Sequence, residues 1–198
     1  MSYIFVGLGN PGEEYTDTRH NTGRIILEAF AKKNDCTEWK ADMKLKSLAC
    51  TGKVGKEKVT LLMPETFMNN SGNAVRPLVT SAKKAETLVV IHDDLDLPIG
   101  RFKISFGKNS GGHRGVESII KAVKTINFIR LRIGISKANA KGVVKKPQGE
   151  EAVGEYILAK FKKPELEELK NVAKRAGDAL ALIVTDGKET AMGEYNKA

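Results

Sequence analysis

Two short apolar runs constrain the fold of this chain most strongly. Residues 3–8 (YIFVGL) end in a turn that contains glycine and proline, and residues 87–92 (TLVVIH) end in a cluster of aspartates. Short apolar runs that are bounded by such residues are typical of buried strands. Segments with helical spacing lie between the strands, and this alternation predicts an α/β fold.

The other strand-like segments predict that the sheet is mixed. Residues 44–50 and 58–63 are separated by a glycine-containing stretch, which favours an antiparallel hairpin. Residues 101–106 and 128–135 alternate apolar and polar side chains and are expected to form further strands. We therefore expect one domain over residues 1–198, with a twisted mixed β-sheet flanked by helices.

Four segments are expected to form helices. In chain order they cover residues 25–33, about 69–82, 116–124 and 165–184. Asn21 or Thr22 is the expected N-cap of the first helix. Gly72 and Pro77 weaken the second, because an interior proline costs a helix about 3 kcal/mol. Residues 136–151 are polar and rich in lysine, which predicts a long mobile loop.

The charge of the chain is compatible with a polyanionic partner. The sequence has 33 Lys and Arg residues against 24 Asp and Glu, which gives a net charge of +9 over 198 residues. Such an excess speeds encounter with nucleic acid, but an ordinary solvated surface rich in lysine would give the same count. Charge alone therefore leaves both interpretations open.

The cysteines and the hydrophobic pattern indicate in which cellular compartment the protein lies. Cys36 and Cys50 are too far apart for a CxxC motif and too few for a disulfide framework, which favours the reducing cytoplasm. The chain lacks a basic segment followed by a long apolar stretch at its start, and it has no run of about 18 apolar residues. We therefore expect neither secretion nor insertion into a membrane.

The glycine-rich turn after the first strand resembles a dinucleotide-binding fingerprint in spelling only. Residues 7–12 read GLGNPG, but Pro11 lies inside the turn and the helix follows about ten residues later than that motif requires. The turn instead presents Asn10, an uncharged amide that can orient a carbonyl group. Asn10 and Pro11 are equally typical of a simple turn.

His20 is the first candidate for acid–base chemistry. It lies in the polar segment TRHNTG, and histidine titrates near neutrality, which suits a base that activates water. A carboxylate bonded to one ring nitrogen would leave the other free to accept a proton. Asp93 and Asp94 are candidates, and at most one is expected to serve because neighbouring side chains of a strand point in opposite directions.

The sequence favours neither a metal site nor a serine nucleophile. It contains no HExxH motif and no paired Cys and His ligands, and adjacent His92 and Asp93 are expected to face apart. A GxSxG motif is also missing. We expect no bound metal and no cofactor.

Five blocks of the sequence resemble, in order, those of bacterial peptidyl-tRNA hydrolases. They are FVGLGNPGEEYTDTRHNTG (5–23), PETFMNNSG (64–72), VVIHDDLDLPIGRFK (89–103), GGHRGVESI (111–119) and IRLRIGI (129–135). The resemblance extends over nearly the whole chain. It implies a monomeric, cytoplasmic, metal-independent enzyme that hydrolyses the ester between a peptide and the 3′ ribose of tRNA and so recycles tRNA from stalled translation.

The resemblance also implies roles for individual residues in catalysis. His20 would be the base that activates water, and Asp93 would orient His20 and favour its uptake of a proton. Asn10 would contact the scissile region and help to distinguish blocked peptidyl ends from free aminoacyl ends.

Further residues of the same blocks are implied to bind the substrate. Tyr15 and Phe67 would flank the terminal nucleotide or the peptide, as aromatic faces do by stacking. Asn69 would hold substrate or water, and His113 would line the cleft. Arg114 departs from the family pattern, which usually has Asn at this position, and it is a candidate to contact a phosphate of the acceptor end.

Basic residues outside those positions are candidates for contact with tRNA phosphates. They are Lys103, Arg132 and the loop lysines Lys137, Lys141, Lys145 and Lys146. Two rival functions remain, namely an RNA-binding relative without hydrolytic activity and a metal-assisted hydrolase. The presence of Asn10, His20, Asn69 and Asp93 argues against the first.

Overall fold

Four parallel strands form the centre of the sheet in a computed structural model that describes residues 2–197. In spatial order they are β4 (Glu57–Pro64), β1 (Ser2–Gly7), β5 (Leu88–Pro98) and β7 (Ile129–Ala138). Antiparallel strands complete both sides, with β3 (Ser47–Val54) and β2 (Lys40–Asp42) next to β4, and β6 (Phe102–Phe106) and β8 (Val144–Lys145) next to β7. The sheet is therefore mixed, as the sequence predicts.

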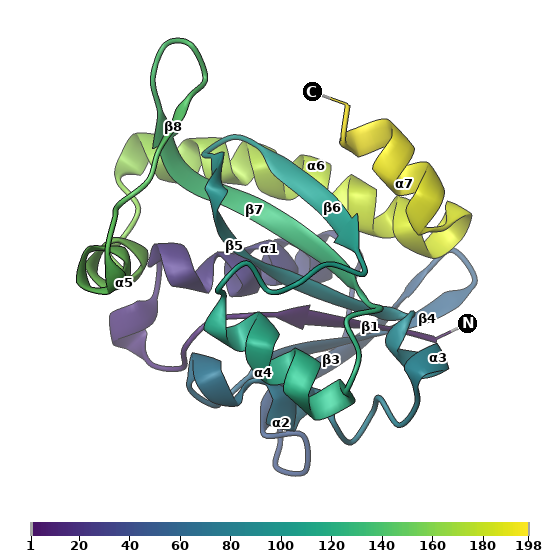
Figure 1. Ribbon diagram of the computed structural model, residues 1–198. Helices are drawn as coiled ribbons and strands as arrows, with labels where there is room; N and C mark the ends of the chain where they lie inside the picture. The colour runs from purple at the N-terminus through teal and green to yellow at the C-terminus, as the bar shows by residue number, and fades with distance from the viewer. Residues whose placement is uncertain (1, 198) are drawn as a thin grey trace.

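Helices cover both faces of this sheet (Figure 1). The helices α1 (Thr22–Lys33), α6 (Lys163–Asp186) and α7 (Lys188–Tyr195) pack on one face. The other face is covered by α2 (Gly72–Val75) and α4 (Arg114–Val123), with α3 (Ala82–Ala85) leading into β5. The helix α5 (Glu150–Leu158) lies beyond the end of the sheet, and three short 3-10 helices connect these elements, namely η1 (Glu13–Tyr15), η2 (Arg19–Asn21) and η3 (Met68–Asn70).

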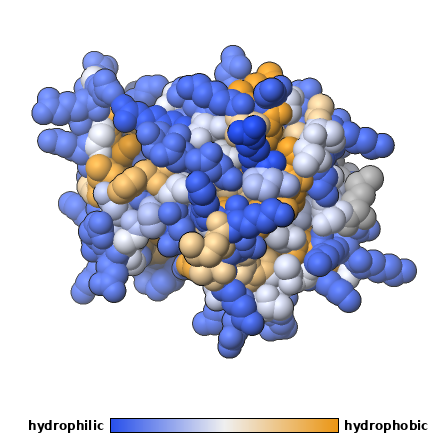
Figure 2. Space-filling view, turned by 90° about the horizontal axis from the view of Figure 1, so that it is seen from below, coloured by the Kyte–Doolittle hydropathy of each residue, from blue (hydrophilic) through white to orange (hydrophobic). Residues whose placement is uncertain are grey.

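The central strands divide the apolar core into two clusters. Phe5 of β1 packs with the α1 and α6 side chains, whereas its neighbour Val6 packs with α2 and α4. Both side chains are fully buried, as expected for a strand that lies between two helical layers. Seen from below, from the side on which α2 and α4 lie in Figure 1, the surface is mainly hydrophilic with small apolar areas (Figure 2). None of the helices within residues 2–197 has the length and hydropathy needed to cross a membrane.

The prediction of one helix over residues 69–82 is wrong. The chain instead forms η3 and α2, which ends at Val75, and the next helix begins only at Ala82. Pro77 lacks the backbone N–H that would continue the helical hydrogen bonds. Gly72 serves a different purpose, because it lets α2 approach α4 closely enough for the Gly72 N–H to donate to Ser118 Oγ at 2.9 Å.

The loop expected over residues 136–151 is shorter than predicted, because only residues 139–143 and 146–149 lie outside strands and helices. β7 continues to Ala138 and pairs with β8 through Lys137 and Lys145, and α5 begins at Glu150. Two glutamates in the first turn of α5 interact favourably with the helix dipole, which helps such a short helix to begin there. The helix α7 and the strand β2 were not predicted from the sequence.

The first turn of α1 fits closely against the ends of β1 and β5. A Cβ added to Gly23 would lie 2.2 Å from the carbonyl oxygen of Ile91 and 2.5 Å from the backbone nitrogen of Leu8. We expect Gly23→Ala to lower the free energy of unfolding by about 1–3 kcal/mol, because backbone atoms must move to relieve the overlap. Urea-induced unfolding measures this change.

A second glycine supplies the matched control for this prediction. Gly193 lies in α7, and a Cβ added there would have no heavy atom within 4 Å. Gly193→Ala should leave stability unchanged or raise it by up to about 1 kcal/mol through the higher helix propensity of alanine. An equal loss of stability in both variants would contradict the proposed packing constraint.

Candidate active site

A cleft of about 1100 Å³ lies beside the carboxyl ends of β1 and β5. Such ends of parallel strands commonly bear functional loops, because the loops that follow them gather at one edge of the sheet. Of the eight residues that the family resemblance implies for catalysis and substrate binding, seven line the cleft, namely Asn10, His20, Phe67, Asn69, Asp93, His113 and Arg114. Tyr15 is the exception, since it is half-buried on η1 and is not among the cleft-lining residues within the described part of the chain.

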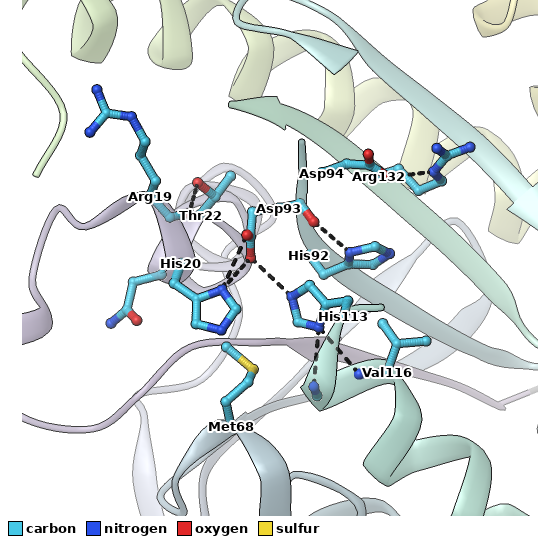
Figure 3. Close-up of polar contacts among 12 residues, drawn as sticks. Arg19, His20, Thr22, Met68, His92, Asp93, Asp94, His113, Val116 and Arg132 are labelled. Carbon is cyan, nitrogen blue, oxygen red and sulfur yellow. Dashed lines mark hydrogen bonds and ion pairs between the residues drawn. The ribbon is translucent and has the colours of Figure 1, made fainter. Parts of the chain in front are cut away.

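His20 and Asp93 form the central contact of the cleft (Figure 3). The Nδ1 atom of His20 lies 3.0 and 3.1 Å from the two carboxylate oxygens of Asp93, and both residues are buried. An ionised carboxylate only accepts hydrogen bonds, so Nδ1 carries the hydrogen and Nε2 keeps a free lone pair. The contact therefore leaves Nε2 of His20 able to accept a proton.

The strand geometry distinguishes Asp93 from Asp94. β5 does not end at the aspartates, as the sequence suggested, but continues through them to Pro98 and pairs with β7. Successive side chains therefore point to opposite faces. Asp94 accepts a hydrogen bond from Nε of Arg132 at 2.6 Å, away from His20 (Figure 3). Only Asp93 of this pair contacts His20.

Burial and neighbouring charge shift the pKa values of His20 and Asp93 in opposite directions. Burial by itself lowers the pKa of His20, but the negative charge of Asp93 and the hydrogen bond to it have the larger combined effect, and the pKa is raised. For Asp93, burial raises the pKa, but the nearby His20 and His113 hold it far below its ordinary value. Asp93 is thus ionised at neutral pH and stabilises a positive charge on His20.

His113 is a second partner of Asp93 and is also the N-cap of α4. Its Nδ1 accepts hydrogen bonds from the backbone N–H groups of Gly115 and Val116, at 3.1 and 3.3 Å. Because Nδ1 is an acceptor, Nε2 carries the hydrogen, and it donates to Oδ1 of Asp93 at 3.0 Å. Two backbone donors therefore fix the orientation of this ring.

The same three side chains form a group that could be considered for a metal ion. One ligand atom from each of His20, Asp93 and His113 lies within 4.8 Å of the others. A histidine binds a metal through an unprotonated nitrogen at about 2.0–2.1 Å. The Nε2 atom of His113 bears a hydrogen in the tautomer just described, and the N–O separations of 3.0 Å are those of hydrogen bonds. The contacts favour a hydrogen-bonded network over a metal site.

Asn10 is held from two sides. Its side-chain oxygen accepts a hydrogen bond from the backbone N–H of Met68 at 2.9 Å, which leaves the amide nitrogen to donate within the cleft. Its backbone N–H donates to Oδ1 of Asn21 at 2.8 Å, and its carbonyl accepts from Nδ2 of Asn21 at 2.9 Å. Asn21 therefore fixes the Asn10 loop, and its side chain does not cap α1 as the sequence suggested.

Arg19 anchors η2, on which His20 lies. It is buried, donates from Nη1 to the carbonyl oxygens of Ala159 and Lys160 at 3.1 and 3.0 Å, and forms a 2.8 Å ion pair with Glu165. Its guanidinium group also lies 4.7 Å from the centre of the Tyr156 ring. No pattern in the sequence indicates this role of Arg19, because its partners are about 140 residues away along the chain.

His92 lies behind the other two histidines. Its Nδ1 donates to the backbone oxygen of Asp93 at 2.7 Å, and its ring centre is 4.7 Å from that of His113. Complete burial lowers the pKa of His92, and the nearby His113 lowers it further, so this ring is neutral at neutral pH. The side chains of His92 and Asp93 face apart, as predicted (Figure 3).

Basic residues line one part of the cleft. Lys103, Lys146 and Arg132, which the sequence analysis proposed, are among them. Lys108 and Arg130 also line the cleft and were not proposed. The alternation of a strand could have identified Arg130, because it lies two residues before Arg132 on β7 and so shares its face. The other proposed lysines, Lys137, Lys141 and Lys145, are not among the described cleft-lining residues.

Comparisons with known proteins agree on one family. Residues 4–198 match the family model for peptidyl-tRNA hydrolase. The peptidyl-tRNA hydrolase of Dehalococcoides mccartyi is 40% identical over 195 residues, and that of Carboxydothermus hydrogenoformans is 40% identical over 196; each alignment covers 98% of both chains. The crystal structure of peptidyl-tRNA hydrolase from Acinetobacter baumannii superposes with a TM-score of 0.87 at 33% identity, covering 98% of this chain and 94% of that one.

Proposed function

The chain belongs to the peptidyl-tRNA hydrolase family, and on this premise we propose that it recycles tRNA from stalled translation through water activated by His20. Family membership supports peptidyl-tRNA hydrolase function and a peptidyl-tRNA substrate. The observation that carries the proposed mechanism is the contact between Nδ1 of His20 and the carboxylate of Asp93 inside the cleft. A histidine with this partner is suited to act as a general base.

The proposed reaction transfers one proton from water to the leaving group. Nε2 of His20 takes a proton from water as its oxygen attacks the carbonyl carbon of the ester. Asp93 stabilises the resulting imidazolium by its negative charge. The bond between the carbonyl carbon and the ribose oxygen then breaks, and His20 returns the proton to that oxygen. The products are a peptide with a free carboxyl group and a tRNA with a free 3′-terminal hydroxyl group.

Asn10 is proposed to recognise the ester and its blocked neighbour. Its amide nitrogen is free to donate because the side-chain oxygen is bound to Met68. A donor at this place stabilises negative charge that develops on the carbonyl oxygen. It also favours the carbonyl acceptor of a peptide bond over the positively charged amino group of a free aminoacyl ester. Asn69 on η3 also lines the cleft and is proposed to hold substrate or water.

The nucleotide part of the substrate is proposed to bind at an aromatic and basic part of the cleft. Phe67 is 60% exposed and lines the cleft, so its ring is available for stacking on a base or a peptide side chain. The same role for Tyr15 remains a prediction from the family resemblance. Lys103 and Arg132 are proposed to contact tRNA phosphates, and His113 to line the site.

The enzyme is proposed to work as a single domain without a metal. We expect residues 1–198 to act as one monomeric domain in the cytoplasm, where peptidyl-tRNA is made. No metal is required in the proposed mechanism, because Asp93 and the amides of Asn10 and Asn69 supply the charge stabilisation that a metal would otherwise provide.

One assay tests this function. It measures tRNA release from an N-acetyl-aminoacyl-tRNA in the presence of EDTA, with the same aminoacyl-tRNA without the acetyl group as control. Rapid release from the blocked ester alone is the expected result. Binding of tRNA without release would favour an RNA-binding role, and loss of activity that Zn²⁺ or Mg²⁺ restores would favour a metal-assisted hydrolase.

Asn21→Ala tests the positioning of Asn10. The substitution removes both hydrogen bonds from Asn21 to the Asn10 backbone, and leaving buried polar groups without partners costs about 1–3 kcal/mol. We expect kcat/KM for blocked aminoacyl-tRNA to fall about tenfold, since 1.4 kcal/mol corresponds to a factor of ten. Preference for the blocked over the free ester should weaken as well.

Asn34→Ala is the control for this effect. Asn34 follows α1 and donates one side-chain hydrogen bond to the Phe30 carbonyl at 2.9 Å. The variant should lose some stability but retain its preference for the blocked ester. If Asn34→Ala and Asn21→Ala weaken that preference equally, the effect of Asn21 is a general loss of stability and not the positioning of Asn10.

A further inference from the structure

A second groove, of about 500 Å³, lies between α2 and α4 next to the cleft. Asn69 and Arg114 line both the groove and the cleft, so the two are adjacent at these residues. Arg76, which directly follows α2, and Lys121 of α4 line the groove but not the cleft. The groove therefore leads away from the candidate active site between two helices.

The two helices that form the groove are held in close contact. The backbone N–H of Gly72 donates to Oγ of Ser118 at 2.9 Å, and a Cβ added to Gly72 would lie 2.3 Å from the Ser118 carbonyl oxygen. Any side chain larger than hydrogen at position 72 would push the helices apart. The spacing of the groove is thus set by backbone contacts and is present before a ligand binds.

The charge of the groove is predominantly positive. Among the described residues that line the groove, Arg76, Arg114 and Lys121 are the cations and Glu117 is the one carboxylate, which already accepts a hydrogen bond from the Ser110 hydroxyl. Within residues 2–197, neither Arg76 nor Lys121 takes part in an ion pair. Arg114 pairs with Glu150 of α5, but both side chains are largely exposed, and exposed pairs contribute little. These three cations are available to an anionic ligand.

The substrate has two parts that must leave the reacting ester in different directions. Lys103 and Lys108, whose side chains are exposed, line the cleft but not the groove, and they suit the phosphates of the tRNA part. The groove opens at Asn69 and Arg114 and contains neither of these lysines. It therefore offers the peptide part a path that is separate from them.

We propose that this groove binds the peptide part of the substrate and selects peptides with acidic side chains near the esterified residue. The proposal rests on the function proposed above and identifies Arg76, Arg114 and Lys121 as specificity-determining residues. A guanidinium group binds a carboxylate through paired hydrogen bonds, which an uncharged amide side chain cannot form equally well. Arg114 places one of the three cations at the entrance of the groove, where it meets the cleft.

The test compares two substrates that differ only in charge. N-acetyl-Glu-Glu-Ala-tRNA and N-acetyl-Gln-Gln-Ala-tRNA share the tRNA, the ester and nearly the same shape. We expect kcat/KM of the unmodified enzyme to be about fivefold higher for the Glu substrate, since exposed ion pairs contribute modestly. The difference should lie mainly in KM and should decrease with added salt.

Variants of the groove assign the preference to its cations. In Arg76→Gln/Lys121→Gln the ratio of the two kcat/KM values should fall most of the way to one, because Arg114 alone remains of the three cations. Lys83→Gln is the matched control, because Lys83 is an exposed cation on α3 that does not line the groove, and its ratio should equal that of the unmodified enzyme.

The outcomes separate this inference from the function on which it rests. Hydrolysis of both substrates at equal rates by the unmodified enzyme would overturn the inference and leave the function intact. Hydrolysis of neither would contradict the function itself. If the double variant loses the same activity on both substrates and also binds deacylated tRNA more weakly than Lys83→Gln does, the groove binds tRNA phosphates, and the peptide assignment is wrong.

Discussion

His20→Ala is expected to lower kcat/KM for N-acetyl-aminoacyl-tRNA by about 10² to 10⁴, the usual contribution of a positioned general base. The variant retains Asp93 and Asn10 but has no group that can take the proton from water. The loss should appear in kcat, because the bound substrate still occupies the cleft. Single-turnover release of tRNA measures the chemical step directly.

Two controls show whether the loss of kcat/KM in His20→Ala comes from the chemical step. The dissociation constant for deacylated tRNA should change little in His20→Ala, because the lysines and arginines that line the cleft are unaltered. His20→Asn keeps a polar side chain of similar size but provides no base, and it should be as inactive as His20→Ala. Activity within about threefold of the unmodified enzyme in either variant would exclude His20 as the base, since general-base catalysis contributes at least about 10².

The sequence predicted the buried strands and the helices α1, α4 and α6 that pack against them, but not the bounds of α2 or the presence of α7. Residues 3–8 and 87–92 are continuous apolar runs, and the structure buries both between helical layers as β1 and the first half of β5. The pattern could not show that β5 continues through the aspartates. That extension depends on pairing with β7, in which Asp93 lies opposite Ile133. Local composition does not encode this partner.

The sequence predicts a site residue best where the alternation of a strand determines the side to which its side chain points. The sequence alone reduced the partner of His20 to one of Asp93 and Asp94, and the family resemblance favoured Asp93. Asn21 was expected from the sequence only as a helix cap. Its side chain instead bonds to the Asn10 backbone, and this contact joins the loop after β1 to the residue before α1.

Residues 136–151 show why short elements escape prediction. The segment is polar and contains glycine and proline, so no apolar pattern marks β8 or the start of α5, which continues beyond this segment to Leu158. In the structure, α5 is held by its neighbours. The Tyr156 hydroxyl donates to the Ile135 carbonyl at 2.8 Å, and Arg19 lies against the Tyr156 ring. Tertiary contacts of this kind override weak local preferences.

Asp93→Asn is expected to lower kcat/KM by about 10²-fold or more, although it changes the shape of the side chain little. Asparagine has no negative charge, so it cannot stabilise the imidazolium that forms when His20 takes a proton. If its amide nitrogen faces His20, Nδ1 must accept a hydrogen bond, and the hydrogen then moves to Nε2. In that tautomer Nε2 cannot act as the base. The same single-turnover assay measures the loss.

The pH dependence of Asp93→Asn distinguishes this electrostatic role from a structural one. Asp93 raises the pKa of His20, and His20 must be unprotonated to act as a base. In the unmodified enzyme, kcat/KM should therefore rise with pH through the raised pKa and then level off. In the variant that pKa falls, so the rise should occur at lower pH, to a much lower plateau. A rise at unchanged pH would show that Asp93 does not set the protonation of His20.

The same charge pair predicts how stability depends on pH. A raised pKa of His20 in the folded state adds stability that is fully present below the unfolded pKa and is lost as pH rises through the folded value. The depressed pKa of Asp93 adds stability that is present above its unfolded pKa and is lost as pH falls through the folded value. Asp93→Asn removes both contributions. Its Tm should therefore change less than that of the unmodified protein between neutral and mildly alkaline pH and again at acid pH. Parallel Tm curves for the two proteins would mean that the His20–Asp93 contact is not an ion pair in solution.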